Sequence, residues 1–150
     1  MKIQYASDLH LEFTENDSWL TKKNLIPKAD ILVLNGDIIV LHDGFENNKF
    51  FDYISTNFKQ TYIIPGNHEF YGGFDMKDAL TMDINIRPNV KLLNNQAIII
   101  NNTKFIFTTL WTKITDEFIK DYISDFHKSV YNDELLSVKN YNDLHHKCVS

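Results

Sequence analysis

Three short apolar runs, each followed at once by a polar cluster, constrain the fold of this 150-residue chain more than any other feature. The runs occupy residues 2–6, 31–34 and 62–64. None alternates strictly between apolar and polar residues, and the segments between the runs are each long enough for a helix. Continuous apolar runs joined by helical crossovers are typical of parallel strands that are covered on both faces. The first half of the chain therefore predicts an α/β fold.

The remaining segments predict two crossover helices, a meander and a final helix. Residues 43–58, and more briefly 76–82, have the pattern of crossover helices. After Pro88, apolar runs at 90–93, 97–100 and 104–110 are separated by asparagine pairs that favour turns, so we expect a β-meander that could extend the same sheet. From about Asp133, a helix is expected to carry one apolar face, made of Leu135, Val138, Tyr141, Leu144 and Cys148.

Composition excludes several classes of protein. With 43% hydrophobic and 13% aromatic residues the chain can bury a core, but its longest apolar runs fall far short of the roughly 20 residues of a membrane span. The first residues leave no room for a secretory signal, and the single Cys148 cannot form an internal disulfide, so we expect a cytoplasmic protein. A net charge of −5 with a single arginine argues against nucleic acid as a partner.

The polar clusters come directly after the three predicted strands. Because the carboxyl ends of parallel strands lie along one edge of a sheet, the clusters should meet there. Such carboxylate and imidazole groups would repel one another or stay partly protonated without a cation. A mixture of carboxylate, imidazole and amide oxygen suits Mn²⁺, Fe or Zn²⁺ better than Ca²⁺. The residues expected to converge are Asp8, His10, Asp37, Asn67 and His68.

In order and spacing, these clusters resemble the first three signatures of the calcineurin-like metallophosphoesterases. The matching motifs are Asp8-Leu9-His10, Gly36-Asp37 and Gly66-Asn67-His68-Glu69, and residues 107–112 look like a segment of one bacterial and phage branch of that family. The resemblance implies a mixed β-sheet sandwich flanked by helices. It also implies hydrolysis of a small-molecule phosphoester at a dinuclear site of divalent ions (Mn, Fe, Zn or Mg) that hold a bridging hydroxide.

The resemblance further assigns roles to single residues. It implies that Asp8 and His10 bind one metal, that Asp37 bridges both metals, and that Asn67 binds the second. It implies that His68 protonates the leaving group or contacts the phosphate. These roles agree with the chemistry of the side chains, because a carboxylate has two oxygens that can reach two ions and an imidazole can donate a proton near neutral pH.

The chain departs from the family in its last third. Two further histidine motifs of the family are absent, and the paired His145 and His146 are poor substitutes, because adjacent helical side chains point about 100° apart. His42 and His127 are interpreted as solvated. We therefore expect residues 1–150 to be one metallophosphoesterase-like domain that is truncated, or incomplete at its C-terminal side. The alternative is a noncatalytic homologue that forms homo-oligomers through uncovered sheet edges.

Four other residues have two interpretations each. Glu12 and Glu69 could orient His10 or His68 through hydrogen bonds, or be solvated loop carboxylates. Tyr71 and Trp111 could line a substrate cleft or pack in the core. Cys148 is expected to be a buried, unreactive thiol, because that helix face lacks cationic neighbours.

Overall fold

A five-stranded sheet organises the computed structural model, which describes residues 1–22 and 25–150. Strands β1, β2, β3 and β5 are parallel neighbours in that order, and β4 pairs antiparallel with β5 at one edge. Strand β2, which lies between β1 and β3, is apolar from Ile31 to Leu34, and Leu32 and Leu34 are fully buried. The predicted parallel sheet is confirmed. Its strands are β1 (Ile3–Ala6), β2 (Ile31–Asn35), β3 (Gln60–Ile64), β4 (Asp83–Arg87) and β5 (Val90–Leu93).

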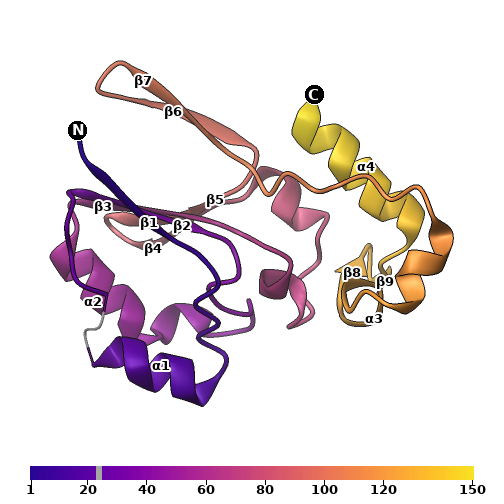
Figure 1. Ribbon diagram of the computed structural model, residues 1–150, viewed down its shortest axis with the longest axis horizontal. Helices are drawn as coiled ribbons and strands as arrows, with labels where there is room; N and C mark the ends of the chain where they lie inside the picture. The colour runs from indigo at the N-terminus through magenta and orange to yellow at the C-terminus, as the bar shows by residue number, and fades with distance from the viewer. Residues whose placement is uncertain (23–24) are drawn as a thin grey trace.

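Two helices cover one face of this sheet, and a β-hairpin lies over the other (Figure 1). The helices are α1 (Thr14–Thr21) and α2 (Lys49–Asn57), and the hairpin consists of β6 (Gln96–Ile100) and β7 (Thr103–Phe107). Helix α2 begins where the side chain of Asn48 accepts a hydrogen bond from the backbone N–H of Phe50 at 2.8 Å. The mixed sheet flanked by helices confirms the expected fold class.

The hairpin corrects the expectation of a meander in a single sheet. Strand β5 joins the main sheet beside β3, whereas β6 and β7 pair only with each other, among the described residues, in a separate two-stranded sheet. The chain leaves β5 through Asn94, whose buried amide donates to the carbonyl of Ala79, and Asn95, whose backbone is left-handed. Strand β4 was not predicted, although Ile84 and Ile86 alternate with polar residues there as in a half-buried strand.

The final helix begins later than expected. Helix α4 spans Val138–Val149, and its N-terminus is capped by the Ser137 hydroxyl, which accepts from the N–H of Asn140 at 3.2 Å. Asn132 and Asp133 have left-handed backbones and form the turn between β8 (Val130–Tyr131) and β9 (Glu134–Leu135). Residue Leu135 therefore lies in β9 rather than on the helix. The short helix α3 (Asp125–Lys128) precedes this hairpin.

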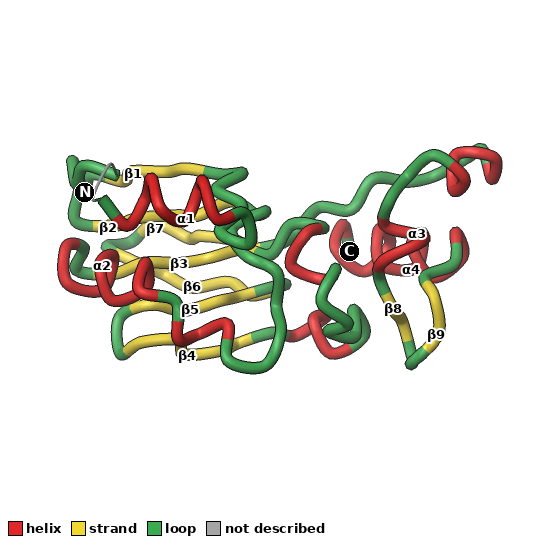
Figure 2. The backbone as a smooth tube through the Cα atoms, turned by 90° about the horizontal axis from the view of Figure 1, so that it is seen from below, coloured by secondary structure: helices red, strands yellow, loops and turns green. Residues whose placement is uncertain are grey.

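The residues after β7 form a second group of elements beside the sheet. Figure 2 shows α3, α4, β8 and β9 together, beyond the carboxyl ends of β1, β2 and β3. Helix α4 packs through Tyr141, whose ring lies 5.3 Å from that of Trp111 and 5.6 Å from that of Phe126. No helix within the described residues is long and apolar enough to cross a membrane. The edge of the sheet that carries the polar clusters thus faces this second group.

Candidate metal centre

The loops after β1 and β2 run side by side and carry the first two polar clusters. The backbone N–H of Asp8 donates to the carbonyl of Gly36 at 3.1 Å, and the N–H of His10 donates to the carbonyl of Asp37 at 2.9 Å. Asp8, His10 and Asp37 all have left-handed backbones, with φ of 56°, 47° and 56°. Such conformations are uncommon outside glycine, and the bonds between the loops hold them in place.

The side chains of these residues meet as the sequence predicts. One ligand atom each from Asp8, His10 and Asp37 lies within 4.8 Å of the other two, and His10, Glu12 and His68 form a second such group. The third loop is tied to the same place, because the N–H of His68 donates to Oδ1 of Asp37 at 3.0 Å. The structure therefore brings the candidates from all three strand ends to one edge of the sheet.

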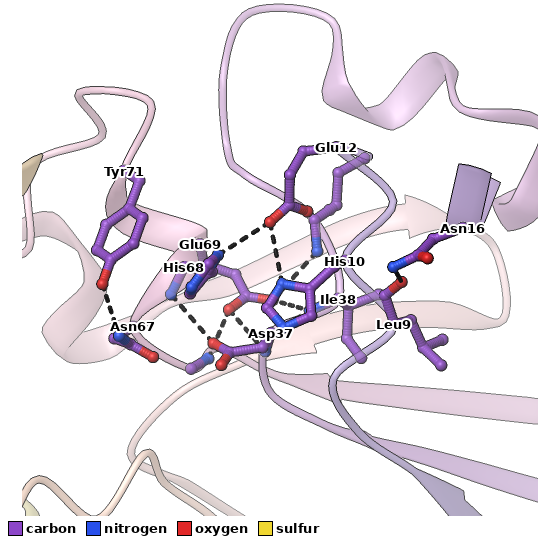
Figure 3. Close-up of polar contacts among 12 residues, drawn as sticks. Leu9, His10, Glu12, Asn16, Asp37, Ile38, Asn67, His68, Glu69 and Tyr71 are labelled. Carbon is purple, nitrogen blue, oxygen red and sulfur yellow. Dashed lines mark hydrogen bonds and ion pairs between the residues drawn. The ribbon is translucent and has the colours of Figure 1, made fainter. Parts of the chain in front are cut away.

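Glu12 links the two histidines of the site. Its Oε1 lies 3.0 Å from Nδ1 of His10 and 2.9 Å from Nδ1 of His68 (Figure 3). Burial raises the pKa of Glu12, but hydrogen bonds from its own backbone N–H and from both histidines outweigh burial, so its pKa is lowered. With Nδ1 of each ring bonded to Glu12, Nε2 of His10 is the nitrogen left for a cation. Of the two sequence interpretations, Glu12 follows the one in which it orients the histidines.

Glu69 follows neither of its two interpretations. Its side chain is only 1% exposed, and its carboxylate accepts from the backbone N–H groups of Gly66 at 2.7 Å, Asp37 at 3.0 Å and Ile38 at 2.7 Å. Burial raises its pKa to about 7, although these hydrogen bonds act to lower it. Glu69 thus joins the loop after β2 to the loop after β3, instead of orienting a histidine or being solvated.

Asn67 belongs to a hydrogen-bonded triad that the sequence did not predict. Its Nδ2 lies 2.8 Å from the hydroxyl of Tyr71 and 2.8 Å from Oδ1 of Asp125, and the Tyr71 hydroxyl donates to the same Oδ1 at 2.5 Å. Burial raises the pKa of Tyr71, and the hydrogen bond with Asp125 raises it further. Asp125 comes from α3. Nothing in the sequence marks it as a residue of the site, since an aspartate at the start of a helix is common.

An open cavity of about 420 Å³ adjoins the cluster. Asp8, Asp37 and Asn67 line it together with Trp111, which is 8% exposed, so this tryptophan is both packed and part of the cleft wall. Tyr71 packs its ring 4.5 Å from that of His68. The cavity gives a ligand access to the carboxylates from the side of the second group of elements.

The remaining histidines and the cysteine lie outside both candidate ligand groups. Nδ1 of His145 pairs with the carbonyl of Trp111 at 2.6 Å, and His42 is exposed and bonded to the carbonyl of Asp43. The half-buried Cys148 lies 3.1 Å from the carbonyl of His145. The groups that could hold a cation, within residues 1–22 and 25–150, include neither His145 nor His146.

The donor set fits a divalent cation. Asp8, His10 and Asp37 offer two carboxylates and one imidazole, a combination found around Mn²⁺, Fe and Zn²⁺. The second ring nitrogen of His10 is bonded to a carboxylate, as is usual for a metal-binding histidine. Figure 3 shows the amide oxygen of Asn67 turned toward Asp37, so a further oxygen ligand is available beside these three.

Three known proteins or families are similar to this chain. The family model described as calcineurin-like phosphoesterase matches residues 1–147. "Uncharacterized protein L509" of Acanthamoeba polyphaga mimivirus is 31% identical to this chain over an alignment of 160 positions. The alignment covers 91% of this chain and 55% of L509. The crystal structure of phosphopantetheinyl hydrolase (PptH) from Mycobacterium tuberculosis is similar with a TM-score of 0.58 and 18% identity, and covers 98% of this chain and 60% of PptH.

These similarities carry different weight. The chain spans little more than half the length of L509 and of PptH, and the likeness to PptH concerns the fold alone. The family match, by contrast, extends over almost every residue and includes all three strand-end motifs. This chain therefore belongs to the calcineurin-like phosphoesterase family.

Proposed function

We propose that the chain takes part in the metal-dependent hydrolysis of small-molecule phosphoesters. The observation that carries the proposal is the meeting of Asp8, His10 and Asp37, with ligand atoms within 4.8 Å of one another, at the carboxyl ends of parallel strands. Membership of the calcineurin-like phosphoesterase family supports the reaction class. The fold by itself says nothing about the substrate, because selectivity depends on the loops around a site.

Two divalent ions suit the donors around Asp37. Asp8, His10 and Asp37 would hold one ion, and Asp37 with the amide oxygen of Asn67 would hold part of the second ion's ligand shell. Held by these residues, two ions would offset the charge of phosphoryl oxygens and would lower the pKa of water toward neutrality, which would supply a hydroxide for the hydrolysis. Asn67 adds an oxygen ligand without adding negative charge that would repel a phosphate.

His68 is the proposed proton donor to the leaving group. Its Nδ1 is bonded to Glu12, so Nε2 is the atom that can hold and release a proton toward a substrate. Its backbone N–H is bonded to Asp37 and its ring packs against Tyr71, so the imidazole has a fixed place beside the carboxylates. Glu12 acts in this proposal by orienting both imidazoles.

The second ion has only two proposed ligands in this chain, Asp37 and Asn67. The chain spans 55% of L509 and 60% of PptH, and we propose that residues outside this sequence supply the missing ligands. We therefore expect the 150-residue chain to be at most weakly active alone. A version extended past Ser150 along its reading frame should be far more active.

The test is an assay of both versions with Mn²⁺ and a chromogenic phosphodiester. In the active version, Asp37→Asn should abolish turnover, and His68→Gln should lower kcat by about 10²-fold to 10⁴-fold. Asp43→Asn and His42→Gln are matched controls, because both residues are exposed, and both variants should retain full activity. If the extended version is inactive with Mn²⁺, Fe²⁺ and Zn²⁺ alike, the proposed hydrolase function is wrong.

A noncatalytic role in self-association is the second candidate function. The observation in its favour is the outer face of the β6–β7 hairpin, where Ile99 and Ile106 are 76% and 65% exposed. A second copy of the chain that packed on this face would cover both side chains. Sedimentation over a range of protein concentrations decides this, since a monomer at every concentration would count against self-association.

A further inference from the structure

We propose that Asp125 is a positioning residue, which, together with Tyr71, holds the side chain of Asn67 with its amide oxygen toward Asp37. The inference rests on the proposed function, in which that oxygen binds a cation. An asparagine can bind a cation only through its oxygen, because the amide nitrogen carries hydrogens and offers no lone pair. Which end of the amide faces the cavity therefore decides whether Asn67 can be a ligand.

The hydrogen bonds around Asn67 allow one arrangement of donors and acceptors. An ionised carboxylate only accepts, so the Tyr71 hydroxyl donates its single hydrogen to Oδ1 of Asp125 at 2.5 Å. The lone pairs of that hydroxyl then accept one hydrogen of Asn67 Nδ2, at 2.8 Å. The other hydrogen of Nδ2 goes to Oδ1 of Asp125, also at 2.8 Å. Both hydrogens of the amide are used on the side away from Asp37.

Turning the amide over would break this arrangement. The oxygen of Asn67 would then lie against Oδ1 of Asp125, so that two acceptors would face each other without a hydrogen between them. A buried acceptor left in this way loses its hydrogen bond and gains repulsion from the carboxylate. Because Asp125 is only 4% exposed, water has little access to compensate. Asp125 thus selects the rotamer in which the oxygen of Asn67 faces the cavity.

The contacts of Asp125 set it apart from the proposed ligands. Its Oδ1 is already shared by Asn67 and Tyr71, and Asp125 belongs to neither of the ligand groups among the described residues. It lies 58 positions after Asn67, on α3 in the second group of elements. Docking of that group against the sheet edge therefore completes the orientation of a residue at the end of β3.

The first test measures the amide of Asn67 directly, without metal. In NMR spectra of the 150-residue chain, the Asn67 side-chain amide, assigned by its loss in Asn67→Asp, should exchange slowly with water. Asp125→Ala and Tyr71→Phe should each speed that exchange by about tenfold or more. Asp121→Ala is the matched control, because it removes an exposed aspartate from the same segment, and should leave the exchange rate unchanged.

The second test is Mn²⁺ binding followed by electron paramagnetic resonance. In the version extended past Ser150, which is proposed to carry the missing ligands, the wild type should show a tighter and a weaker class of sites, and Asp125→Ala should raise the Kd of the weaker class by about 10-fold to 100-fold. The tighter class, assigned to Asp8 and His10 with Asp37, should change by less than about twofold. Asp125→Asn keeps an oxygen acceptor and the shape of the side chain, and should restore part of the loss. This variant and Tyr71→Phe keep the test valid if Asp125→Ala does not fold.

The outcomes separate this inference from the proposed function. Unchanged amide exchange and unchanged Mn²⁺ binding in all three variants would overturn the positioning role. Equal weakening of both classes of Mn²⁺ site would also overturn it, since that result indicates a general structural role. A wild type that binds no Mn²⁺, or a single class, would overturn the proposed use of Asn67 as a ligand, whatever the amide exchange shows.

Discussion

At the scale of single residues, the candidate site is held by backbone groups as much as by side chains. Three of the proposed ligands have left-handed backbones, which cost about 1 to 3 kcal/mol each in a non-glycine residue. The carbonyls of Gly36 and Asp37 and the carboxylate of Glu69 accept hydrogen bonds from these loops and their neighbours. The position of the carboxylates thus depends on how closely the three loops approach one another.

Gly66, in the loop after β3, lies directly against Asp37 in the loop after β2. A Cβ at this position would lie 2.2 Å from Oδ1 of Asp37 and 2.8 Å from its backbone nitrogen. We expect Gly66→Ala to lower the free energy of unfolding by about 3 kcal/mol, since the backbone of the neighbouring loop has to move. Urea unfolding of the purified chain measures this change.

The control for this variant is Gly73→Ala. Gly73 has φ of 85°, and a Cβ there would meet nothing within 4 Å, so the only cost is the left-handed backbone, about 1 kcal/mol. Equal destabilisation by the two substitutions would show that Gly66 is not needed for contact between the loops.

Glu12 gives a prediction about acid stability. Its pKa is lowered in the folded chain, so the unfolded chain binds a proton more readily and stability falls with the pH in the acid range. The contribution of Glu12 is present above the usual glutamate pKa of about 4.3 and is lost below it. Between about pH 6 and pH 3, the wild type should therefore lose more stability than Glu12→Gln, as measured by urea unfolding at each pH.

The control is Glu46→Gln, which removes an exposed carboxylate. Over the same pH range, this variant should lose as much free energy of unfolding as the wild type does. If Glu12→Gln and the wild type lose equal stability over this range, Glu12 makes no favourable contact with the histidines in the folded chain.

The sequence predicts those residues of the site that lie next to a strand end. Asp8, His10, Asp37, Asn67 and His68 follow apolar runs directly, so a parallel sheet suffices to bring them together. Asp125 could not be predicted in this way, because its contact with Asn67 depends on the packing of a segment 58 positions later. The role of Glu69 was also missed, since burial of a carboxylate against backbone N–H groups depends on the path of two loops.

At the scale of secondary-structure elements, the hairpin β6–β7 forms a second layer. Its inner face packs on the sheet through Phe107, which is 2% exposed and whose ring lies 5.0 Å from that of Tyr62. The alternation of apolar residues predicts these strands. It does not tell whether they extend the sheet or fold over it, because that choice depends on the turn at Asn94 and Asn95.

Phe107→Ala should lower the free energy of unfolding by at least about 3 kcal/mol, because it leaves a cavity between the two layers. Ile99→Ala, on the outer face of the same hairpin, should change it by less than about 0.5 kcal/mol, since Ile99 is 76% exposed. Thermal and urea unfolding of both variants measure the difference. A small effect of Phe107→Ala would mean that the hairpin does not pack on the sheet in solution.

At the scale of the whole molecule, the site lies where two groups of elements meet. The sheet supplies Asp8, His10 and Asp37, and the C-terminal group supplies Asp125 and one wall of the cavity, through Trp111 and Tyr141. The strand ends of β1 and β2 thus form the proposed cation site, with the loop after β3 beside it.

An anomalous difference map from crystals of the chain grown with Mn²⁺ tests this site directly. We predict a strong peak bounded by the carboxylates of Asp8 and Asp37 and by Nε2 of His10, and its loss in crystals of Asp37→Asn. A map with no peak at these three residues, or with Mn²⁺ bound instead at His145 and His146, would show that Asp8, His10 and Asp37 do not form a cation site.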